Sequence, residues 1–282
     1  MLHELPREQR ALHGHFSRDL APVVAIEPGD SVRISVPNAG WRIDSGDRFE
    51  PPDAELDTGH ALAGPVEVRG ARAGRTLAVR IDDVAPGPWG VTFGNEHEMR
   101  WELLDGTARS GRFAVVMRPF LGVLGMPPPE PGAHSTIPPR RWGGNIDCKE
   151  LVAGSTLFLP IPIDGALFSA GDMHAAQGDG EVSGTAIECP GRATLSFDVR
   201  DEPLEWPRAR TRDAWITFGF GADVGAAAKV ATDEMLVLLQ ELHDVSRDEA
   251  LALASVAVDL RVTQVVNDAV GVHAVLRDDA LG

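Results

Sequence analysis

Short apolar runs recur through the first three quarters of the chain, and several of them alternate between apolar and polar residues. Because successive side chains of a strand point to opposite faces, this pattern predicts short β-strands. Turn signals such as Pro28-Gly29-Asp30 and Ala73-Gly74 stand between the runs. The predicted strands cover residues 23–26, 32–36, 66–69, 77–81, 113–117, 156–159, 182–188, 193–199 and 214–218. Their regular spacing favours a β-sandwich or a related body of stacked sheets.

The last quarter of the chain has a different period. Apolar residues fall at helical spacing and mark one face at Ala231, Met235, Leu238 and Leu242. Ser246 and Glu249 form a capping-box pattern ahead of the alanine- and leucine-rich residues 250–258. We therefore expect two helices packed against the sheets, followed by a closing pair of strands over 260–266 and 270–276.

Together these patterns predict an α+β protein that is mostly β, with β-sandwich-like sheets and C-terminal helices packed against them. Abundant glycine (30 residues) and proline (21 residues) agree with many short strands joined by turns. We expect a β-rich part over 1–125 and a second part over 126–282 that carries the main motif and the helices, both within one compact unit. The proline cluster at 126–131, continued by Pro138-Pro139, predicts a long irregular connection, of a kind that is often functional or mobile.

The charge of the chain argues against a nucleic-acid partner. Asp and Glu number 42 and Lys and Arg number 26, which leaves a formal net charge of −16, whereas phosphate binding needs clustered basic residues. The most apolar long run, 151–171, is interrupted by Pro160, Pro162 and Asp164, so we expect no membrane span. The opening MLHELPREQR has no apolar core and predicts no secretory signal. Two cysteines make no disulfide framework, so a reduced, cytoplasmic setting is expected.

The densest group of ionisable residues is GDMHAAQGDGE at 171–181. Asp172 and His174 are two residues apart, so in an extended segment they share one face. Asp179 and Glu181 repeat this spacing, and three glycines allow the second pair to turn back toward the first. Carboxylates this close repel one another unless protons or a cation lie between them. One interpretation is a site for a divalent metal. One histidine with oxygen ligands suits zinc in an open catalytic site, whereas a site with fewer imidazoles suits calcium or magnesium. The other interpretation is a solvated acidic hairpin tip.

Other motifs favour ordinary structural roles. No EF-hand, HExxH or G-x-S-x-G pattern occurs in the chain. Cys148 has no evident partner base, so a small buried side chain is favoured over a nucleophile. The glycines of 219–225 have the wrong spacing for a dinucleotide loop and predict a strand-to-helix turn. His13 and His15 are read by default as satisfied or exposed histidines, with the lining of a pocket as the alternative.

Residues 141–188 closely resemble the acetamidase/formamidase family. The resemblance is carried by GGNID at 143–147, by GSTLFLP at 154–160 and by GDMHAAQGDGE at 171–181. Supporting matches stand at 64–66 and 118–120, and the likeness extends over nearly the whole chain.

This resemblance implies a cytoplasmic amidohydrolase that splits formamide or a short aliphatic amide into carboxylate and ammonia. It also implies a mostly β architecture with appended helices, a homodimer, and a divalent metal, with zinc expected. Two alternatives stay open: a paralogue that hydrolyses another small C–N bond, and a metal-stabilised β-sandwich binding protein without catalysis.

For amide hydrolysis we assign roles to the residues of these motifs. The expected metal ligands are His174, Asp147 and Asp172. Glu181 is the expected general base, and Asn145 and Gln177 are expected to orient the amide or its oxyanion. Asp179 and Glu188 are candidates for further ligands or for groups that hold a ligand in place.

A tiny substrate needs a small, walled pocket. The candidates for its wall are Trp142, Phe168, His13 and Trp89. Trp142 stands where family members typically have His, and Asn38 and Cys148 replace an acidic residue and a Thr. If the missing His contributes to the site, metal affinity, substrate choice or activity itself will differ from that of the family.

Overall fold

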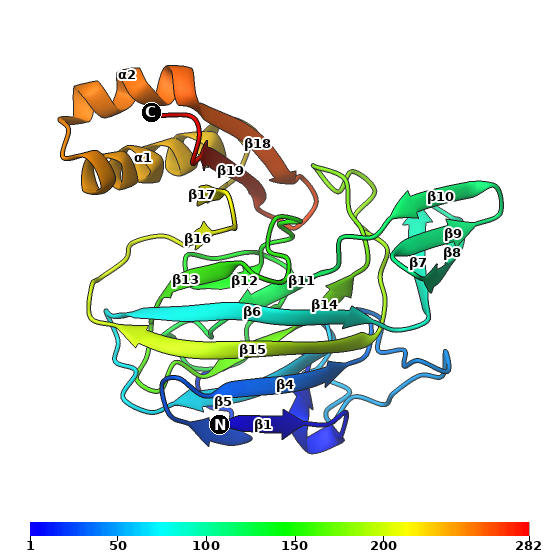
Figure 1. Ribbon diagram of the computed structural model, residues 1–282. Coiled ribbons are helices and arrows are strands. Elements are labelled where there is room, and N and C mark those ends of the chain that lie inside the picture. The colour runs from blue at the N-terminus through cyan, green and yellow to red at the C-terminus, as the bar shows by residue number, and fades with distance from the viewer. Residues whose placement is uncertain (282) are drawn as a thin grey trace.

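Two large β-sheets share one hydrophobic core and make up most of the chain, of which the computed structural model describes residues 1–281 (Figure 1). The first sheet has nine strands in the order β1 (Leu2–Leu5), β4 (Ser31–Val36), β15 (Gly191–Arg200), β6 (Thr76–Pro86), β13 (Thr156–Pro160), β16 (Arg208–Arg210), β17 (Ala214–Gly221), β19 (Val270–Arg277) and β18 (Val258–Gln264). The second has the order β12 (Gly143–Asn145), β11 (Phe120–Gly125), β14 (Phe168–His174), β5 (Leu62–Val68) and β2 (Leu12–His13), with β3 (Val24–Ile26) paired to β5. A short 3-10 turn, η1 (Gln9–Ala11), precedes β2.

The burial pattern differs between the two sheets. Along β4, Val32, Ile34 and Val36 are buried and the residues between them are not, because one face of this strand is turned away from the core. Every residue of β11 and β14 is buried, so chain covers both faces of these strands. Between such strands and the loops that cover them, a polar site can be shielded from solvent.

A four-stranded antiparallel sheet projects from the body as an arm (Figure 1). It consists of β7 (Trp89–Gly94), β8 (His97–Leu104), β9 (Thr107–Ser110) and β10 (Phe113–Val116), paired in chain order. All four residues of β10 are exposed. Strand β7 also forms a bridge to Glu188, which brings the base of the arm beside the main motif.

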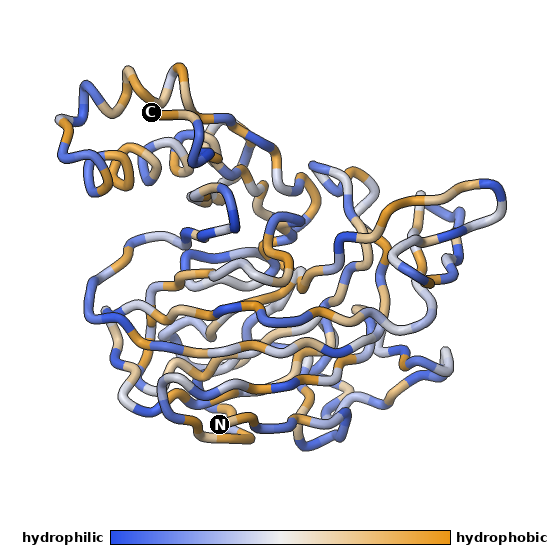
Figure 2. Tube along the Cα trace, viewed as in Figure 1, coloured by the Kyte–Doolittle hydropathy of each residue, from blue (hydrophilic) through white to orange (hydrophobic). Residues whose placement is uncertain are grey.

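Helix α1 (Val224–His243) packs against β17 and β19, and α2 (Arg247–Ala257) packs against α1 and β18, so that a second core forms there (Figures 1 and 2). The predicted capping box is present, because the Ser246 and Glu249 side chains each bond to the other's backbone N–H. The buried face of α1 includes Met235 and Leu238, but Leu242 is 44% exposed, so this face ends one turn earlier than its spacing predicted. Among residues 1–281, neither helix is long and apolar enough to cross a membrane.

Each predicted strand overlaps an observed one, with ends that shift by up to five residues, except for the strand expected over 182–188. That segment is irregular: the chain turns at Glu181, where the Gly184 N–H donates to the Glu181 carbonyl, and Val182 is 83% exposed. The prediction was wrong because the apolar–polar alternation there does not reflect a strand with one buried face. Hydrogen-bonded strand pairs such as β5 with β14 and β6 with β15 join 1–125 to 126–282 within both sheets.

Candidate active site

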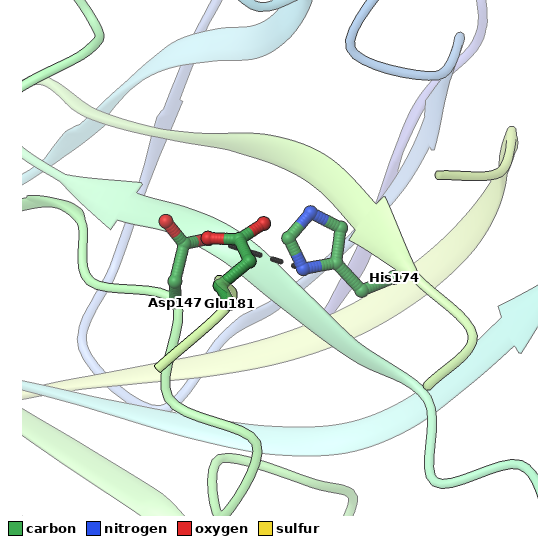
Figure 3. Close-up of side chains that lie close together, drawn as sticks. All are labelled: Asp147, His174 and Glu181. Atoms are coloured by element: carbon green, nitrogen blue, oxygen red, sulfur yellow. Dashed lines mark ion pairs between the residues drawn. The ribbon is translucent and has the colours of Figure 1, made fainter. Parts of the chain in front are cut away.

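Five ionisable side chains converge in the buried space beside β14. Asp172 and His174 lie at the end of β14, Asp147 follows β12, Glu181 lies in the loop after β14, and Glu188 forms a backbone bridge with His174. All five are at most 7% exposed. His174 Nε2 lies 3.3 Å from Asp172 Oδ1 and 3.2 Å from Glu188 Oε2, and its Nδ1 lies 3.9 Å from Asp147 Oδ1. Figure 3 shows the carboxylates of Asp147 and Glu181 facing the imidazole ring.

Three of the four carboxylates stand on left-handed backbone. The φ angles are 53° at Asp147, 56° at Asp172 and 44° at Glu181. Such a conformation costs about 1–3 kcal/mol for a residue with a side chain, and it is concentrated at functional sites. Here it lets three separate segments turn their carboxylates into one space.

Gly122 of β11 leaves the room that this convergence needs. A Cβ at this position would lie 2.5 Å from both Asp147 Oδ1 and Asp172 Oδ2, and 3.0 Å from His174 Cε1. The Gly122 carbonyl also accepts hydrogen bonds from the N–H groups of Ile146 (3.0 Å) and Asp147 (3.2 Å). This glycine therefore both makes space for the cluster and holds one of its members.

Burial makes the negative charges of the cluster costly. It raises the pKa of Glu181 to about 10, with a further contribution from the charge of Asp147. It raises the pKa of Asp147 to about 6, and that of Glu188 moves in the same direction for the same reason. Protons or a cation must therefore balance these carboxylates.

Asp172 and His174 form the ionised pair within the cluster. Burial acts against a charged Asp172, but the charges of His174 and His60 hold its pKa below the usual range. Burial also acts against a charged His174, yet Glu188 and Asp172 raise its pKa well above the usual value. One imidazolium cannot balance four carboxylates, so negative charge remains in excess.

The oxygens of the site are poorly satisfied by the protein itself. Four buried oxygens have no hydrogen-bond partner within the described part of the chain: Asn145 Oδ1, Asp147 Oδ1, Asp172 Oδ1 and Glu188 Oε2. Buried polar atoms are rarely left unpaired, and each is costly. Carboxylate oxygens and an imidazole nitrogen are donors that suit a divalent metal such as zinc. The residues present therefore fit a bound cation.

Gln177 determines which nitrogen of His174 is available. Its Nε2 donates to the Asp147 carbonyl (2.7 Å), so its Oε1 faces His174 Nδ1 (3.0 Å). Because Oε1 can only accept, Nδ1 carries the hydrogen, and in the neutral ring the free electron pair is on Nε2. Two sets of ligand atoms each lie within 4.8 Å of one another, Asp147–His174–Glu181 and Asp172–His174–Glu188, and this tautomer favours the second. Gln177 was expected to orient substrate, but both ends of its amide are engaged in holding the site.

Asp179 lies apart from the cluster. Its carboxylate pairs with Lys149 (3.0 Å) and with Arg261 (2.6 Å). Asp179 and Glu181 are two residues apart in sequence, yet only Glu181 points inward. Between the two acids, the Gly180 N–H donates to the backbone carbonyls of Val262 and Thr263 in β18. The Gly180 carbonyl accepts from the Val265 N–H, so the loop is held against this strand and the residue that follows it.

A cavity of about 300 Å³ borders the cluster. Beside the acids and His174 it is lined by Asn38, Ala39, Gly40, Arg42, His60, Val91, Phe93, Asn145, Gly184, Thr185 and Asn267. The expected wall residues Trp142, Phe168, His13 and Trp89 are not among those that line it. Phe168 packs instead in the hydrophobic core, where its ring lies edge-on against that of Phe197.

Two residues of the site carried no signal in the sequence. Asn267 Nδ2 donates to Asp147 Oδ2, and the Gln264 side chain holds the turn by accepting from the Asn267 N–H (3.1 Å). His60 Nδ1 lies 2.9 Å from Thr136 Oγ1, and its charge acts on both Asp147 and Asp172. Both residues come from loops far from the motif, so only the fold brings them in.

Cys148 follows Asp147 but takes no part in this chemistry. It is fully buried, and burial raises the pKa of its thiol to about 12. A thiol that stays protonated at neutral pH is a packing group, as the sequence favoured.

Comparison with known proteins gives one consistent result. A family model described as the Acetamidase/Formamidase family matches residues 2–115 and 129–276. A protein of Schizosaccharomyces pombe named as a formamidase is 30% identical over 267 residues, which cover 68% of this chain and 65% of that protein. The formamidase of Methylophilus methylotrophus is 26% identical over 253 residues, covering 64% of this chain and 62% of that protein. The matches thus span just under two thirds of the length of these relatives.

Solved structures agree along the full chain. The acetamidase of Bacillus halodurans superposes with a TM-score of 0.87 at 27% identity, covering 97% of both chains. The acetamidase of Yersinia enterocolitica gives a TM-score of 0.90 at 25% identity, covering 100% of this chain and 93% of its own.

Proposed function

Because the chain belongs to the acetamidase/formamidase family, we propose that it hydrolyses a small amide to a carboxylate and ammonia at the cluster around His174. The observation that carries the proposal is the convergence of four buried carboxylates on one imidazole, with unsatisfied oxygens, beside a cavity of about 300 Å³. The names of the relatives, formamidase and acetamidase, support the same reaction class. A homodimer and a cytoplasmic location remain predictions.

Asp172, Glu188 and Nε2 of His174 would hold a divalent metal, for which zinc is our first expectation and calcium the second. Asp147 Oδ1, which has no hydrogen-bond partner in the described residues, is the candidate for a further ligand. When bound, such a metal polarises the amide carbonyl and lowers the pKa of a water molecule.

Glu181 is the group proposed to move the proton. Its carboxyl lines the cavity, and its raised pKa makes the carboxylate a strong base once ionised. It would take a proton from the attacking water and deliver it to the amide nitrogen. The C–N bond then breaks, and ammonia leaves with the proton that makes it a competent leaving group.

Asn145 is the proposed positioning group for the amide. It is 3% exposed, lines the cavity, and its Oδ1 has no partner in the described structure. An amide side chain can accept from the substrate NH₂ through its oxygen and donate to the developing oxyanion through its nitrogen. That complementarity favours a primary amide as the reacting group.

The test replaces Glu181 by Gln and measures ammonia release and bound metal together. We expect turnover to fall about 10²- to 10⁴-fold, the usual contribution of a positioned acid–base group, while the metal is retained. The matched control is Asp179→Asn, which alters an acid two residues away that lies outside the cluster. Normal ammonia release by the Glu181→Gln variant would remove Glu181 from the mechanism.

The same assay separates the alternatives. A chelator should stop ammonia release by the wild-type protein, and zinc should restore it. A wild-type protein that binds metal but releases ammonia from none of a panel of linear, substituted and cyclic amides would be a binding protein. Activity confined to substituted or cyclic amides would instead identify the paralogue.

A further inference from the structure

A second cavity, of about 450 Å³, adjoins the first across Glu181. Glu181 and Thr185 line both, so the outer cavity begins where the inner one ends. The inner cavity is lined largely by ionisable and amide side chains. The outer one has an apolar wall of Trp101, Val115, Val116, Ala176, Val182, Ala186 and Ile187.

This apolar wall comes from two parts of the fold. The arm supplies Trp101 from β8 and Val115 and Val116 from β10, and the loop after β14 supplies Val182 and Ile187. Figure 2 shows the apolar stretch along the upper strand of the arm. Both parts line the same cavity as Glu181.

Two valines that line the outer cavity are largely exposed to solvent, and no packing among residues 1–281 covers them. Val116 is 75% exposed, and Val182, the next residue after Glu181, is 83% exposed. Exposed apolar side chains grouped around a cavity are typical of a binding surface. Their position next to the proposed proton-transfer group points to the substrate as the molecule that covers them.

The charges at the rim of the outer cavity are already paired. Arg118 lies 2.9 Å from Glu150, and Lys149 lies 3.0 Å from Asp179. The rim therefore offers no unpaired cation that would select a carboxylate or phosphate group. Apart from Glu181, the rest of the lining is the apolar wall together with the uncharged polar side chains of Thr92, Gln177, Ser183 and Thr185.

We infer that the outer cavity receives an uncharged apolar group of the substrate while the amide occupies the inner cavity. The substrate class is then an amide with an aliphatic chain longer than that of acetamide. This inference rests on the proposed function and extends it from the reaction to the preferred substrate. The chain is either the acyl group or a substituent on nitrogen, and the proposed role of Asn145 in positioning a primary amide favours the acyl group.

The experiment compares kcat/KM for formamide, acetamide, butyramide and hexanamide with the zinc-supplied protein. Each added methylene that becomes buried should raise kcat/KM about three- to four-fold, until the cavity is filled. N-butylformamide, compared with pentanamide, tests the nitrogen side. Preference for pentanamide supports the acyl assignment, and preference for N-butylformamide keeps the cavity but overturns that assignment.

Variants then locate the effect. Val116→Asp and Val182→Ser should lower kcat/KM for hexanamide at least ten-fold and leave acetamide within two-fold. Val256→Asp is the matched control, since Val256 is 82% exposed on α2, outside both cavities, and it should change neither substrate. Hexanamide no better than acetamide in the wild type, or equal losses for both substrates in the variants, would overturn the inference.

Two further measurements keep the result unambiguous. If Val116→Asp changes the sedimentation mass and lowers all substrates equally, a second copy covers the valines and the inference fails. If no amide is hydrolysed, the proposed function fails, and thermal shift still tests the cavity. A rise in Tm with hexanamide, greater than with acetamide and lost in Val116→Asp, supports it, while the absence of any such rise overturns it.

Discussion

Two buried histidine–carboxylate groups adjoin β14, one through Ser169 and the other at Asp172 and His174, and they differ in how well their hydrogen bonds are satisfied. His13 Nδ1 donates to the His15 carbonyl (2.7 Å), and its Nε2 accepts from Ser169 Oγ (2.9 Å). His15 Nδ1 lies 2.8 Å from Asp57 Oδ1, which also accepts from the Gly14 N–H. In this group the donors match the acceptors, and burial lowers the pKa of His13 to about 4, so that it stays neutral.

The His174 group has the opposite balance. Four carboxylates surround one imidazole, and several of their oxygens have no partner in the described structure. Equal burial therefore gives different outcomes: a satisfied network stabilises the fold, whereas an acceptor-rich one is complete only with a cation or substrate. Counting hydrogen-bond donors and acceptors therefore distinguishes a structural histidine–carboxylate group from one that binds a cation or substrate.

The largest expected effect comes from filling the space inside the acceptor-rich group. Gly122→Ala places a methyl group 2.5 Å from two carboxylate oxygens, so the cluster must spread apart. We expect ammonia release to fall at least about 10²-fold, because displacement of a reacting group by about 1 Å has that cost. Bound metal, measured by elemental analysis, should fall with it.

Gly178→Ala is the control for this change, because an added Cβ there meets nothing within 4 Å. It lies in the same motif and should leave both measurements near wild type. Full activity in Gly122→Ala would show that the cluster does not need its observed geometry.

The second prediction exchanges a carboxylate for its amide in each group. The carboxylate of Asp57 accepts three hydrogen bonds, including one from the Asp53 N–H. In Asp57→Asn the free energy of unfolding should therefore fall by about 2–3 kcal/mol, while the metal content stays unchanged. Glu188→Gln removes one of the excess charges, so the metal-free protein should unfold at a higher temperature while metal affinity falls about 10- to 100-fold. Denaturation and metal titration of both variants check this.

A loss of stability in both variants, with metal affinity retained by Glu188→Gln, would contradict the contrast between the two groups. It would mean that Glu188 is a structural acceptor like Asp57.

The smallest expected effect is on the pH dependence of stability. In the metal-free protein the raised pKa values of Asp147 (about 6) and Glu181 (about 10) let the folded state keep protons that the unfolded chain loses above about pH 4. The native state then binds more protons than the unfolded state, so the free energy of unfolding falls as pH rises. His174, with its raised pKa, acts in the same direction above its ordinary value.

We therefore expect the free energy of unfolding of the chelated protein, followed by its Tm, to fall gradually between pH 5 and pH 8. Zinc should flatten this slope because it replaces the protons. Glu181→Gln should reduce the slope and Asp179→Asn should not. A slope that is the same in all three proteins would assign it to the general acidity of the surface.

Local pattern predicted the elements well where one face of an element is buried. The alternation along β4 and the capping box at Ser246 are short-range features, so they can be read from neighbouring residues. The segment 182–188 alternates in the same way but forms an irregular loop with an exposed Val182. Alternation shows that a strand is compatible with the residues, and only packing decides whether it forms.

The site was predictable as a motif but not as a geometry. Asp172, His174 and Glu181 belong to one short, unusual run of residues. Asp179 belongs to the same run and points away to Arg261 and Lys149. The residue types do not reveal which of Asp179 and Glu181 points into the site. The backbone hydrogen bonds between Gly180 and β18 hold the loop in the conformation that turns Glu181 inward.

The sequence by itself determined the mostly β class, the capped helices, the acidic character and the list of chemical groups available to the site. These depend on side-chain periodicity and residue type, which are local properties. The tertiary structure alone decided that Asn267 and His60 join the cluster, that Gln177 selects the tautomer of His174, and that an apolar cavity adjoins Glu181. Those facts depend on contacts between segments far apart in the chain, whose relative position is set by the packing of whole sheets.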